Sequence, residues 1–266
     1  MAAGIRIFPL FAIIHQQYFK IMKRRLLLIS NSTNYGEAYL GWPRKHIQEF
    51  MEGTGVNDIL FVPYAGVGLS DESLEKSYDV YEAKVQQVFA ELGLRIHSIH
   101  RATDAVEAVK NARAIAVGGG NTFHLVAMMH KLGIMEAIHN RVHDGAHYMG
   151  WSAGSNVACP SLKTTNDMPI AEPSSFDCLG LVPFQINPHY LDANPEGHGG
   201  ETRQQRIEEF LVVNRETVVA GLREASLLWI DDDNIQLIGS KPMRLFRFGE
   251  EPLEFEPGSD VGFLLK

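Results

Sequence analysis

The sequence predicts an α/β fold: a mostly parallel β-sheet with helices on both faces, followed by a C-terminal β-meander. Three observations predict this class. Short apolar runs alternate with longer segments of helical periodicity up to residue 159, which is the pattern of parallel βαβ units. Beyond residue 160 prolines become frequent, and the later apolar runs alternate like antiparallel strands joined by Asp, Asn and Gly turns. With 45% hydrophobic and 21% charged residues, the chain of 266 residues can bury a full core.

The sheet begins with five short apolar runs, each of which predicts a strand. They cover residues 26–30, 59–63, 95–99, 114–117 and 147–150. The segments between them have helical periodicity and predict helices over residues 44–51, 71–92, 105–112, 122–131 and 135–143. The helix from Asp71 has an acid-rich first turn and stops before Gly93, as the helix dipole and capping preferences favour.

The second half continues the same domain with a different pattern. One helix is predicted over residues 202–212, and apolar runs at residues 218–222, 227–230, 235–238 and 244–248 predict the strands of the meander. We expect one domain over residues 22–266. Residues 1–21 are expected to be an N-terminal extension outside this fold, and their apolar stretch is shorter than the ~18 residues that a membrane span needs.

Composition bears on partners and cofactors. The 24 Lys and Arg residues against 32 Asp and Glu give a net charge of -8, the opposite of the basic surface that phosphate backbones select, so we expect no nucleic-acid partner. Cys159 and Cys178 form no CxxC pair and favour a reducing, cytoplasmic compartment. No HExxH or similar ligand cluster occurs, so we expect no metal or other cofactor. We expect no membrane partner, and either a monomer or a homodimer.

A glycine-rich pentapeptide after the fifth predicted strand is the first candidate for chemistry. Residues 150–154 read GWSAG, which matches the G-x-S-x-G nucleophile elbow, a sharp strand-to-helix turn that presents a serine. The context fits, because a short helix over residues 155–159, ended by Pro160, can follow the turn. Ser152 is therefore the candidate nucleophile, and the alternative is a packed Gly/Ala turn without chemistry.

A second glycine-rich turn follows the fourth predicted strand, where residues 117–122 read VGGGNT. Phe123 stands where a dinucleotide-binding fingerprint has its third glycine, so the loop matches a nucleotide phosphate site poorly. The functional interpretation is an oxyanion hole, in which the backbone N–H of Gly119 or Gly120 acts together with that of Ala153. The alternative is a tight turn that simply requires glycine.

A serine nucleophile needs a base, usually a histidine that a carboxylate orients. His189 is the first candidate, because it follows an apolar run in QINPHY, where a proline restrains the backbone. His198 in PEGHGG is its competitor. The candidate acids are Asp167 in TTNDMP and Glu224 in GLREA. The pattern leaves both acids open, since triads are defined by geometry and not by chain order.

Together these motifs closely resemble the aspartyl dipeptidase family of serine peptidases, peptidase E. The resemblance covers residues 24 to about 250 and leaves the N-terminal extension unmatched. It rests on motifs that occur in one order along the chain: LLLISNST (26–33), GGGNTF (118–123), GWSAG (150–154), TTNDMPI (164–170), QINPH (185–189), PEGH (195–198), GETR (200–203) and the pair Arg206 and Ile207.

The resemblance implies an α/β fold similar to class I glutamine amidotransferases, with serine in place of their elbow cysteine, and hydrolysis of dipeptides that have N-terminal aspartate. It places the nucleophile on Ser152 and the base on His189. Two acids of the family fall on Glu224, which we favour as the third triad member, and on Asp167, to which we assign a supporting role near the site. It also implies that Arg203 recognises the aspartate, because a guanidinium can grip a carboxylate through two parallel hydrogen bonds.

Two other functions compete with this expectation. A related enzyme, cyanophycinase-like or an isoaspartyl peptide hydrolase, would split other aspartyl bonds with the same residues. A non-catalytic small-molecule binding module would use residues 118–121 as an anion-binding nest of backbone N–H groups.

Overall fold

The computed structural model describes residues 24–194, 197 and 199–266. The expected N-terminal extension, residues 1–21, and the competing base His198 lie outside the described residues. In this described part of the chain, no helix is long and apolar enough to cross a membrane.

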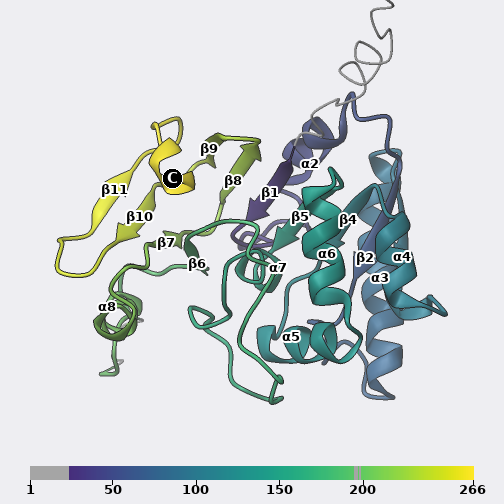
Figure 1. Cartoon of the computed structure of the whole chain (residues 1–266), viewed down its shortest axis with the longest axis horizontal. Helices are drawn as coiled ribbons and strands as arrows, with labels where there is room; N and C mark the ends of the chain where they lie inside the picture. The colour runs from purple at the N-terminus through teal and green to yellow at the C-terminus, as the bar shows by residue number, and fades with distance from the viewer. Residues whose placement is uncertain (1–23, 195–196, 198) are drawn as a thin grey trace, which may run out of the picture.

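The larger of the two sheets that the described residues form has seven strands in the order β3-β2-β4-β5-β1-β8-β9 (Figure 1). Its first five strands along the chain run parallel: β1 (Arg25–Ile29), β2 (Asp58–Val62), β3 (Arg95–Ser98), β4 (Ala114–Val117) and β5 (His147–Trp151). All five lie where the sequence predicts strands. β8 (Ser226–Asp231) pairs antiparallel with β1 and with β9 (Asn234–Gly239). The predicted fold class is confirmed.

Helices cover both faces of this sheet. One face carries α2 (Arg44–Met51) and α3 (Leu74–Glu91), and the other carries α4 (Ala105–Asn111), α5 (Thr122–Lys131) and α6 (Ile134–His143). Alternate residues of β1 serve the two cores. Leu26 and Leu28 pack with the helices of the second group, and Leu27 and Ile29 pack with α2 and α3. A strand buried on both faces is apolar throughout, which is why the run LLLI predicted a strand reliably.

Helix α3 begins later than the predicted segment 71–92. Ser73 is its N-cap, and the Ser73 side chain accepts a hydrogen bond of 3.0 Å from the backbone N–H of Lys76. Asp71 and Glu72 therefore precede the helix, because the Ser73 side chain already satisfies one of the orphan N–H groups of the first turn.

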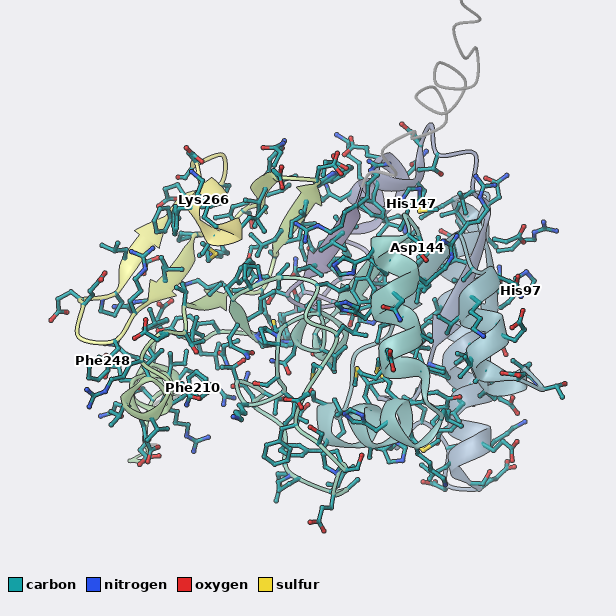
Figure 2. All side chains as sticks on the ribbon, viewed as in Figure 1. His97, Asp144, His147, Phe210, Phe248 and Lys266 are labelled. Carbon is teal, nitrogen blue, oxygen red and sulfur yellow. The ribbon has the colours of Figure 1, made fainter. Side chains whose placement is uncertain are left out.

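A smaller sheet of four strands lies beside the first, in the order β11-β10-β7-β6 (Figure 1). Its strands are β6 (Gln185–Pro188), β7 (Val219–Leu222), β10 (Met243–Phe246) and β11 (Leu253–Phe255). β6 and β7 are parallel, and β7, β10 and β11 are antiparallel neighbours. The last long helix, α8 (Arg203–Val213), packs on this sheet through Ile207 and Leu211. Figure 2 shows Phe210 of α8 on the same side of the molecule as Phe248.

The predicted C-terminal meander is divided between the two sheets. The four late runs do form strands, but β8 and β9 extend the larger sheet as a hairpin, whereas β7 and β10 belong to the smaller one. β7 also pairs with β6, a strand that the sequence pattern did not predict. Alternating polarity indicates a half-buried strand but not which strand it pairs with. The pattern therefore could not assign each strand to one of the two sheets.

Ser30, directly after β1, joins the two sheets where their strands end. Its N–H donates to the carbonyl of Ser226 (3.0 Å) in the larger sheet, and its hydroxyl donates to the carbonyl of Leu222 (2.7 Å) in the smaller one. Because Pro188 of β6 is paired with Leu222 of β7, the segments after both strands emerge beside Ser30. The carboxyl ends of several strands thus meet at one place, where α/β folds usually carry their sites.

Candidate active site

Ser152 stands at the sharp turn between β5 and α7 (Ala153–Asn156). Its φ of 54° and ψ of -114° lie outside the regions that non-glycine residues prefer, as a nucleophile elbow requires. The Ser152 N–H donates to the carbonyl of Ile29 (3.0 Å), which holds the turn against β1. The helix starts earlier than the predicted segment 155–159, because the Ser152 carbonyl already accepts from the N–H groups of Ser155 and Asn156.

The two glycines of the GWSAG motif are required by space. A Cβ at Gly150 would lie 2.3 Å from the carbonyl oxygen of Gly154. A Cβ at Gly154 would lie 2.1 Å from the carbonyl oxygen of Val117, at the end of β4. Backbone atoms cannot be approached this closely by a side chain, so the turn can pack against β4 only with glycine at these positions.

His189 and Glu224 continue a line of contacts that starts at Ser152. Nε2 of His189 lies 3.0 Å from Oγ of Ser152, and Nδ1 of His189 lies 2.8 Å from Oε1 of Glu224. His189 follows β6 and Glu224 lies just beyond β7, so the parallel pairing of these strands brings the two side chains together. The side chains of His189 and Glu224 are 40% and 47% exposed, so this pair faces solvent.

Two residues after β1 hold the backbone at His189 and Glu224. The Ser30 hydroxyl accepts a hydrogen bond of 3.0 Å from the N–H of His189, and Oδ1 of Asn31 accepts one of 2.9 Å from the N–H of Ala225. His189 and Ala225 both have positive φ, 52° and 63°, which a β-carbon disfavours. Sequence reasoning did not assign a role to Ser30 and Asn31, although both lie in the LLLISNST motif.

Asp167, the other candidate acid, lies at the N-terminus of α5 and not against His189. Its Oδ2 accepts hydrogen bonds from the N–H (2.7 Å) and the hydroxyl (2.6 Å) of Thr122 and from the hydroxyl of Thr165 (3.1 Å). A carboxylate is favoured at a helix N-terminus, where unpaired N–H groups and the helix dipole attract negative charge. Of the two acids that the pattern left open, the structure brings Glu224 into contact with the histidine.

The glycine loop after β4 lies against the nucleophile. A Cβ at Gly119 would lie 2.9 Å from Cβ of Ser152, and Gly120 has a φ of 134°, which glycine adopts readily. Within the described part of the chain, the backbone N–H groups of Gly119, Gly120 and Ala153 have no hydrogen-bond partner. Unpaired donors beside a serine are what an oxyanion hole needs.

Tyr81 of α3 fixes this loop from behind. Its hydroxyl donates to the carbonyl of Gly119 (2.9 Å) and accepts from Nε1 of Trp151 (3.0 Å). In a trans peptide the C=O and the following N–H point in opposite directions, so a fixed Gly119 carbonyl also fixes the direction of the Gly120 N–H. Burial raises the pKa of Tyr81 to about 12, which keeps the hydroxyl protonated and able to donate at neutral pH.

Arg203 is the first residue of α8 and is half-buried. Among the described residues, its guanidinium takes part in no hydrogen bond or ion pair. Burial lowers the pKa of Arg203, the positive charge of Arg206 lowers it further, and the carboxylate of Asp167 acts in the opposite direction. A partly desolvated cation gains from an added carboxylate, because the new pair replaces lost hydration.

A cavity of about 460 Å³ opens beside Ser152. Its lining includes Gly119, Gly120, Ser152 and His189 together with side chains of the loop after β1 and of α3. This volume lies within the range of small-ligand sites, about 300 to 1,000 Å³. The cavity can therefore hold a small substrate against the unpaired N–H groups.

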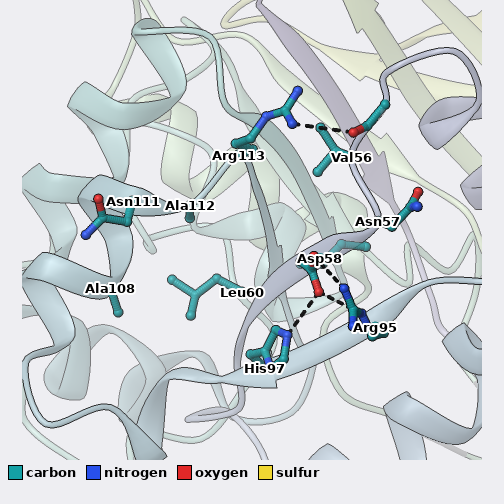
Figure 3. A pocket seen from close by; sticks show the side chains of 12 residues that line it. Val56, Asn57, Asp58, Leu60, Arg95, His97, Ala108, Asn111, Ala112 and Arg113 are labelled. Atoms are coloured by element: carbon teal, nitrogen blue, oxygen red, sulfur yellow. Dashed lines mark hydrogen bonds and ion pairs between the residues drawn. The ribbon is translucent and has the colours of Figure 1, made fainter.

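A second cavity of about 450 Å³ lies elsewhere, at the amino ends of β2 and β3 (Figure 3). There Asp58 lies between Arg95, with an N–O distance of 2.8 Å, and His97, at 3.1 Å. The carboxylate of this cavity is thus already paired, and the cavity's lining contains no residue of the Ser152 site. The two cavities have similar volumes, and they differ in that only the first is lined by Ser152 and His189.

One cluster in the described part of the chain has the spacing of metal ligands, formed by Asp79, Glu82 and His100. Arg101 already pairs with both acids, at 2.5 Å from Asp79 and 2.6 Å from Glu82. Because an arginine neutralises these carboxylates, the cluster is an ion-pair network on the outer side of α3, separate from Ser152.

The profile of peptidase family S51 matches residues 26–238. The chain belongs to this family. It is 50% identical over 245 residues to peptidase E of Nostoc sp. (strain PCC 7120 / SAG 25.82 / UTEX 2576), covering 92% of this chain and 98% of that protein. It is 44% identical over 233 residues to peptidase E of Escherichia coli O6:K15:H31 (strain 536 / UPEC), covering 88% of this chain and 98% of that one.

Solved structures of two other peptidases have the same fold as this S51 chain. A peptidase E protein from Listeria monocytogenes EGD-e is 19% identical, with a TM-score of 0.58, over 82% of this chain and 98% of that chain. A peptidase from an acI-B1 Actinobacterium is 16% identical, with a TM-score of 0.60, over 87% of this chain and 96% of that chain.

Membership of family S51 confirms the enzyme class that the sequence motifs predicted. The protein is a hydrolase, a serine-type dipeptidase that acts on peptides. The resemblance to peptidase E stated from the motifs is likewise confirmed.

Proposed function

We propose that this enzyme hydrolyses dipeptides with N-terminal aspartate through an acyl-enzyme, with Ser152 as nucleophile, His189 as general base and Glu224 as the acid that orients the histidine. The observation that carries the proposal is the line of contacts from Ser152 to Glu224, with distances of 3.0 and 2.8 Å. A serine hydroxyl is a weak nucleophile at neutral pH, and a hydrogen-bonded imidazole activates it.

The first half of the reaction forms an ester on the enzyme. Oγ of Ser152 attacks the peptide carbonyl while Nε2 of His189 takes the hydroxyl proton. The N–H of Ala153 and that of Gly119 or Gly120 stabilise the negative oxygen that forms, each donor being worth about 3 kcal/mol in the transition state. When the C–N bond breaks, His189 gives its proton to the leaving amine, which departs as the second residue.

The second half of the reaction releases aspartate. Water loses a proton to His189 and attacks the ester carbonyl, and the same N–H groups stabilise the second tetrahedral oxyanion. The proton then returns from His189 to Oγ of Ser152, which restores the enzyme. No step requires a metal ion, because the charge that develops is met by backbone N–H groups and by the imidazolium.

Specificity for aspartate is assigned to Arg203. Its half-buried guanidinium has no acidic partner among the described residues, and two parallel hydrogen bonds to the substrate's β-carboxylate would supply one. Asp167, whose charge acts on Arg203, has a supporting role: it limits the excess positive charge when no substrate is bound.

The test is hydrolysis of Asp-Leu by three purified proteins. We expect the wild type to release aspartate and leucine, and Ser152→Ala to lose at least about 10³-fold in kcat, since the nucleophile is gone. Arg203→Ala should raise KM for Asp-Leu about 10- to 100-fold while changing the weak cleavage of Ala-Leu less than about threefold.

Two further measurements separate the alternatives. If β-Asp-Leu is cleaved faster than α-Asp-Leu, the enzyme is an isoaspartyl or cyanophycinase-like hydrolase. A serine-reactive phosphonate should label Ser152 in the wild type, and the absence of both labelling and turnover would leave the binding-module alternative. Equal losses on Asp-Leu and Ala-Leu in Arg203→Ala would contradict the role of Arg203.

We also infer a cytoplasmic enzyme, either a monomer or a homodimer. Cys159 and Cys178 are both free thiols, which fits a reducing compartment. Size-exclusion chromatography with light scattering measures the assembly directly.

A further inference from the structure

The cavity beside Ser152 is lined by one ammonium group and no carboxylate. Among the described residues that line it, Lys84 is the only lysine or arginine, and no Asp or Glu is present. Lys84 is exposed and forms no ion pair or hydrogen bond within the described part of the chain.

Tyr39 holds the Lys84 side chain toward this cavity. Nζ of Lys84 lies 4.1 Å from the centre of the Tyr39 ring, a distance typical of a cation–π contact. Tyr39 and Tyr81 also line the cavity, and their hydroxyls are 3.4 Å apart. Burial of Tyr39 raises its pKa, so this hydroxyl stays neutral and leaves Lys84 as the charged group.

A short series of contacts connects Lys84 to the reacting atoms. Lys84 lies one helical turn beyond Tyr81 on α3, so both side chains leave the same face of the helix. Tyr81 donates to Gly119, the residue whose loop carries the unpaired N–H groups. Lys84 therefore lines the same cavity as Ser152 and the glycine loop, and is connected to that loop through the two tyrosines.

We propose that Lys84 binds the free α-carboxylate of the second substrate residue and thereby restricts the enzyme to dipeptides. This subsite rests on the proposed function, because it needs a peptide carbonyl placed between Ser152 and the Gly119 loop. An extended peptide advances about 3.5 Å per residue, so the α-carboxylate of a dipeptide lies one short step beyond the scissile carbonyl. An ammonium within 4 Å of that carboxylate forms an ion pair in a cavity from which the substrate displaces water.

The two cations then have different partners. Asp-Leu carries two carboxylates, and Arg203 does not line the cavity that contains Lys84. Arg203 begins α8 beneath the smaller sheet, whereas Lys84 belongs to α3 on the larger one. A tripeptide or a dipeptide amide presents a neutral amide in place of the α-carboxylate, so it leaves Lys84 unpaired and loses the interaction.

The test compares kcat/KM for Asp-Leu with kcat/KM for Asp-Leu-amide, which lacks only the charge. We expect the wild type to prefer the free carboxylate, and the ratio of the two values to fall about tenfold in Lys84→Met. Lys84→Arg should recover most of the ratio, because it restores a cation at the same place. Lys76→Met, also on α3 and away from the cavity, is the matched control and should leave the ratio unchanged.

The results distinguish a failure of the Lys84 subsite from a failure of the proposed function. If the wild type hydrolyses Asp-Leu but Lys84→Met leaves the ratio unchanged, including an equal loss on both substrates, the α-carboxylate subsite is wrong and the proposed function stands. If the wild type does not hydrolyse Asp-Leu, the proposed function is wrong and the subsite falls with it. Circular dichroism of Lys84→Met should match the wild type, since the exposed side chain makes no hydrogen bond that folding requires.

Discussion

Glu224 is the most solvent-exposed of the three residues in the line of contacts from Ser152. Its side chain is 47% exposed, so water competes with His189 for the carboxylate and screens the charge. The backbone partly compensates for this exposure. Oδ1 of Asn31 accepts a hydrogen bond from the N–H of Ala225, the residue after Glu224. This bond holds the turn that presents the carboxylate. Orientation of His189 at this site therefore depends on the loop as well as on the charge.

Replacing Glu224 with Gln keeps the shape of the side chain and removes the charge that stabilises the imidazolium. We expect kcat for Asp-Leu to fall about 10- to 1,000-fold, less than the roughly 10⁴-fold loss typical of a buried triad acid, because solvent already screens this pair. Asp167→Asn is the matched comparison. It should lower KM for Asp-Leu and leave kcat within about threefold of the wild type, since removing the Asp167 carboxylate takes away a negative charge that acts on Arg203, and Asp167 has no hydrogen bond to His189 within the described residues. A loss of kcat in Asp167→Asn larger than that in Glu224→Gln would make Asp167 the triad acid.

The sequence identified the separate residues of the site better than their contacts. Ser152 could be predicted because its elbow is local: the two glycines and the serine lie in five consecutive residues. The choice between Glu224 and Asp167 depends on the pairing of β6 with β7, in which Pro188 lies opposite Leu222. These two strands are distant in the chain. No pattern of hydrophobic residues encodes that pairing, so geometry was needed to bring one acid to the histidine.

At the scale of elements, the site depends on a contact between helix α3 and the loop after β4. The Tyr81 hydroxyl joins the carbonyl of Gly119 to the indole of Trp151, the last residue of β5. A Cβ at Gly118 would lie 2.6 Å from that hydroxyl, so the glycine loop and the tyrosine fit only each other. The run of three glycines thus allows the loop to pack against α3 and also leaves backbone N–H groups unpaired beside Ser152.

Removing the Tyr81 hydroxyl should therefore weaken catalysis from outside the triad. In Tyr81→Phe we expect kcat for Asp-Leu to fall about tenfold with less than about a twofold change in KM, because the Gly120 N–H loses its fixed direction. Tyr78→Phe is the control, since Tyr78 lies on the same helix and its hydroxyl donates no hydrogen bond within the described residues. Equal effects of the two substitutions on kcat would show that Tyr81 contributes only to packing.

The elements of the larger sheet were predictable, and those of the smaller sheet were less so. β1 to β5 are buried on one or both faces, so their apolar runs stand out from the polar segments around them. β6 is short and ends in Pro188, which a sequence pattern interprets as loop, although its neighbour β7 supplies the hydrogen-bond partners. The strand that precedes His189 therefore has a weak local signal, whereas β7, which precedes Glu224, is predicted by its apolar run.

At the scale of the whole molecule, the proposed function pairs an acidic protein with an acidic substrate. The net charge of -8 opposes the approach of an anionic dipeptide only weakly at physiological salt, where charges are screened beyond about 8 Å. Binding then depends on local cations, and the described residues supply Arg203 and Lys84 without acidic ion-pair partners. Net charge bears on solubility, and in the proposed function these two side chains select the substrate.

Stability and chemistry are also separated across the larger sheet. His147 begins β5, and Ser152 follows the end of the same strand. A titration at His147 therefore occurs at the opposite end of the strand from the site. Burial lowers the pKa of His147, and the charges of Arg25 and Arg113 lower it further against the opposing effect of Asp231. The imidazole packs edge-on against Phe50 and is held neutral in the folded protein.

The free energy of unfolding should therefore fall as pH drops below about 6.5, the unfolded pKa of histidine. Between that value and the lower folded pKa, the unfolded chain binds more protons at His147 than the folded chain does, so stability rises with pH in this window. His147→Gln removes the titrating group, and we expect its loss of stability between pH 7 and pH 5 in urea unfolding to be smaller than that of the wild type. A pH dependence identical to the wild type would show that His147 is not held neutral by the fold. Activity of the variant on Asp-Leu at pH 7 should remain within about twofold of the wild type, because His147 begins β5 and Ser152 follows the other end of this strand.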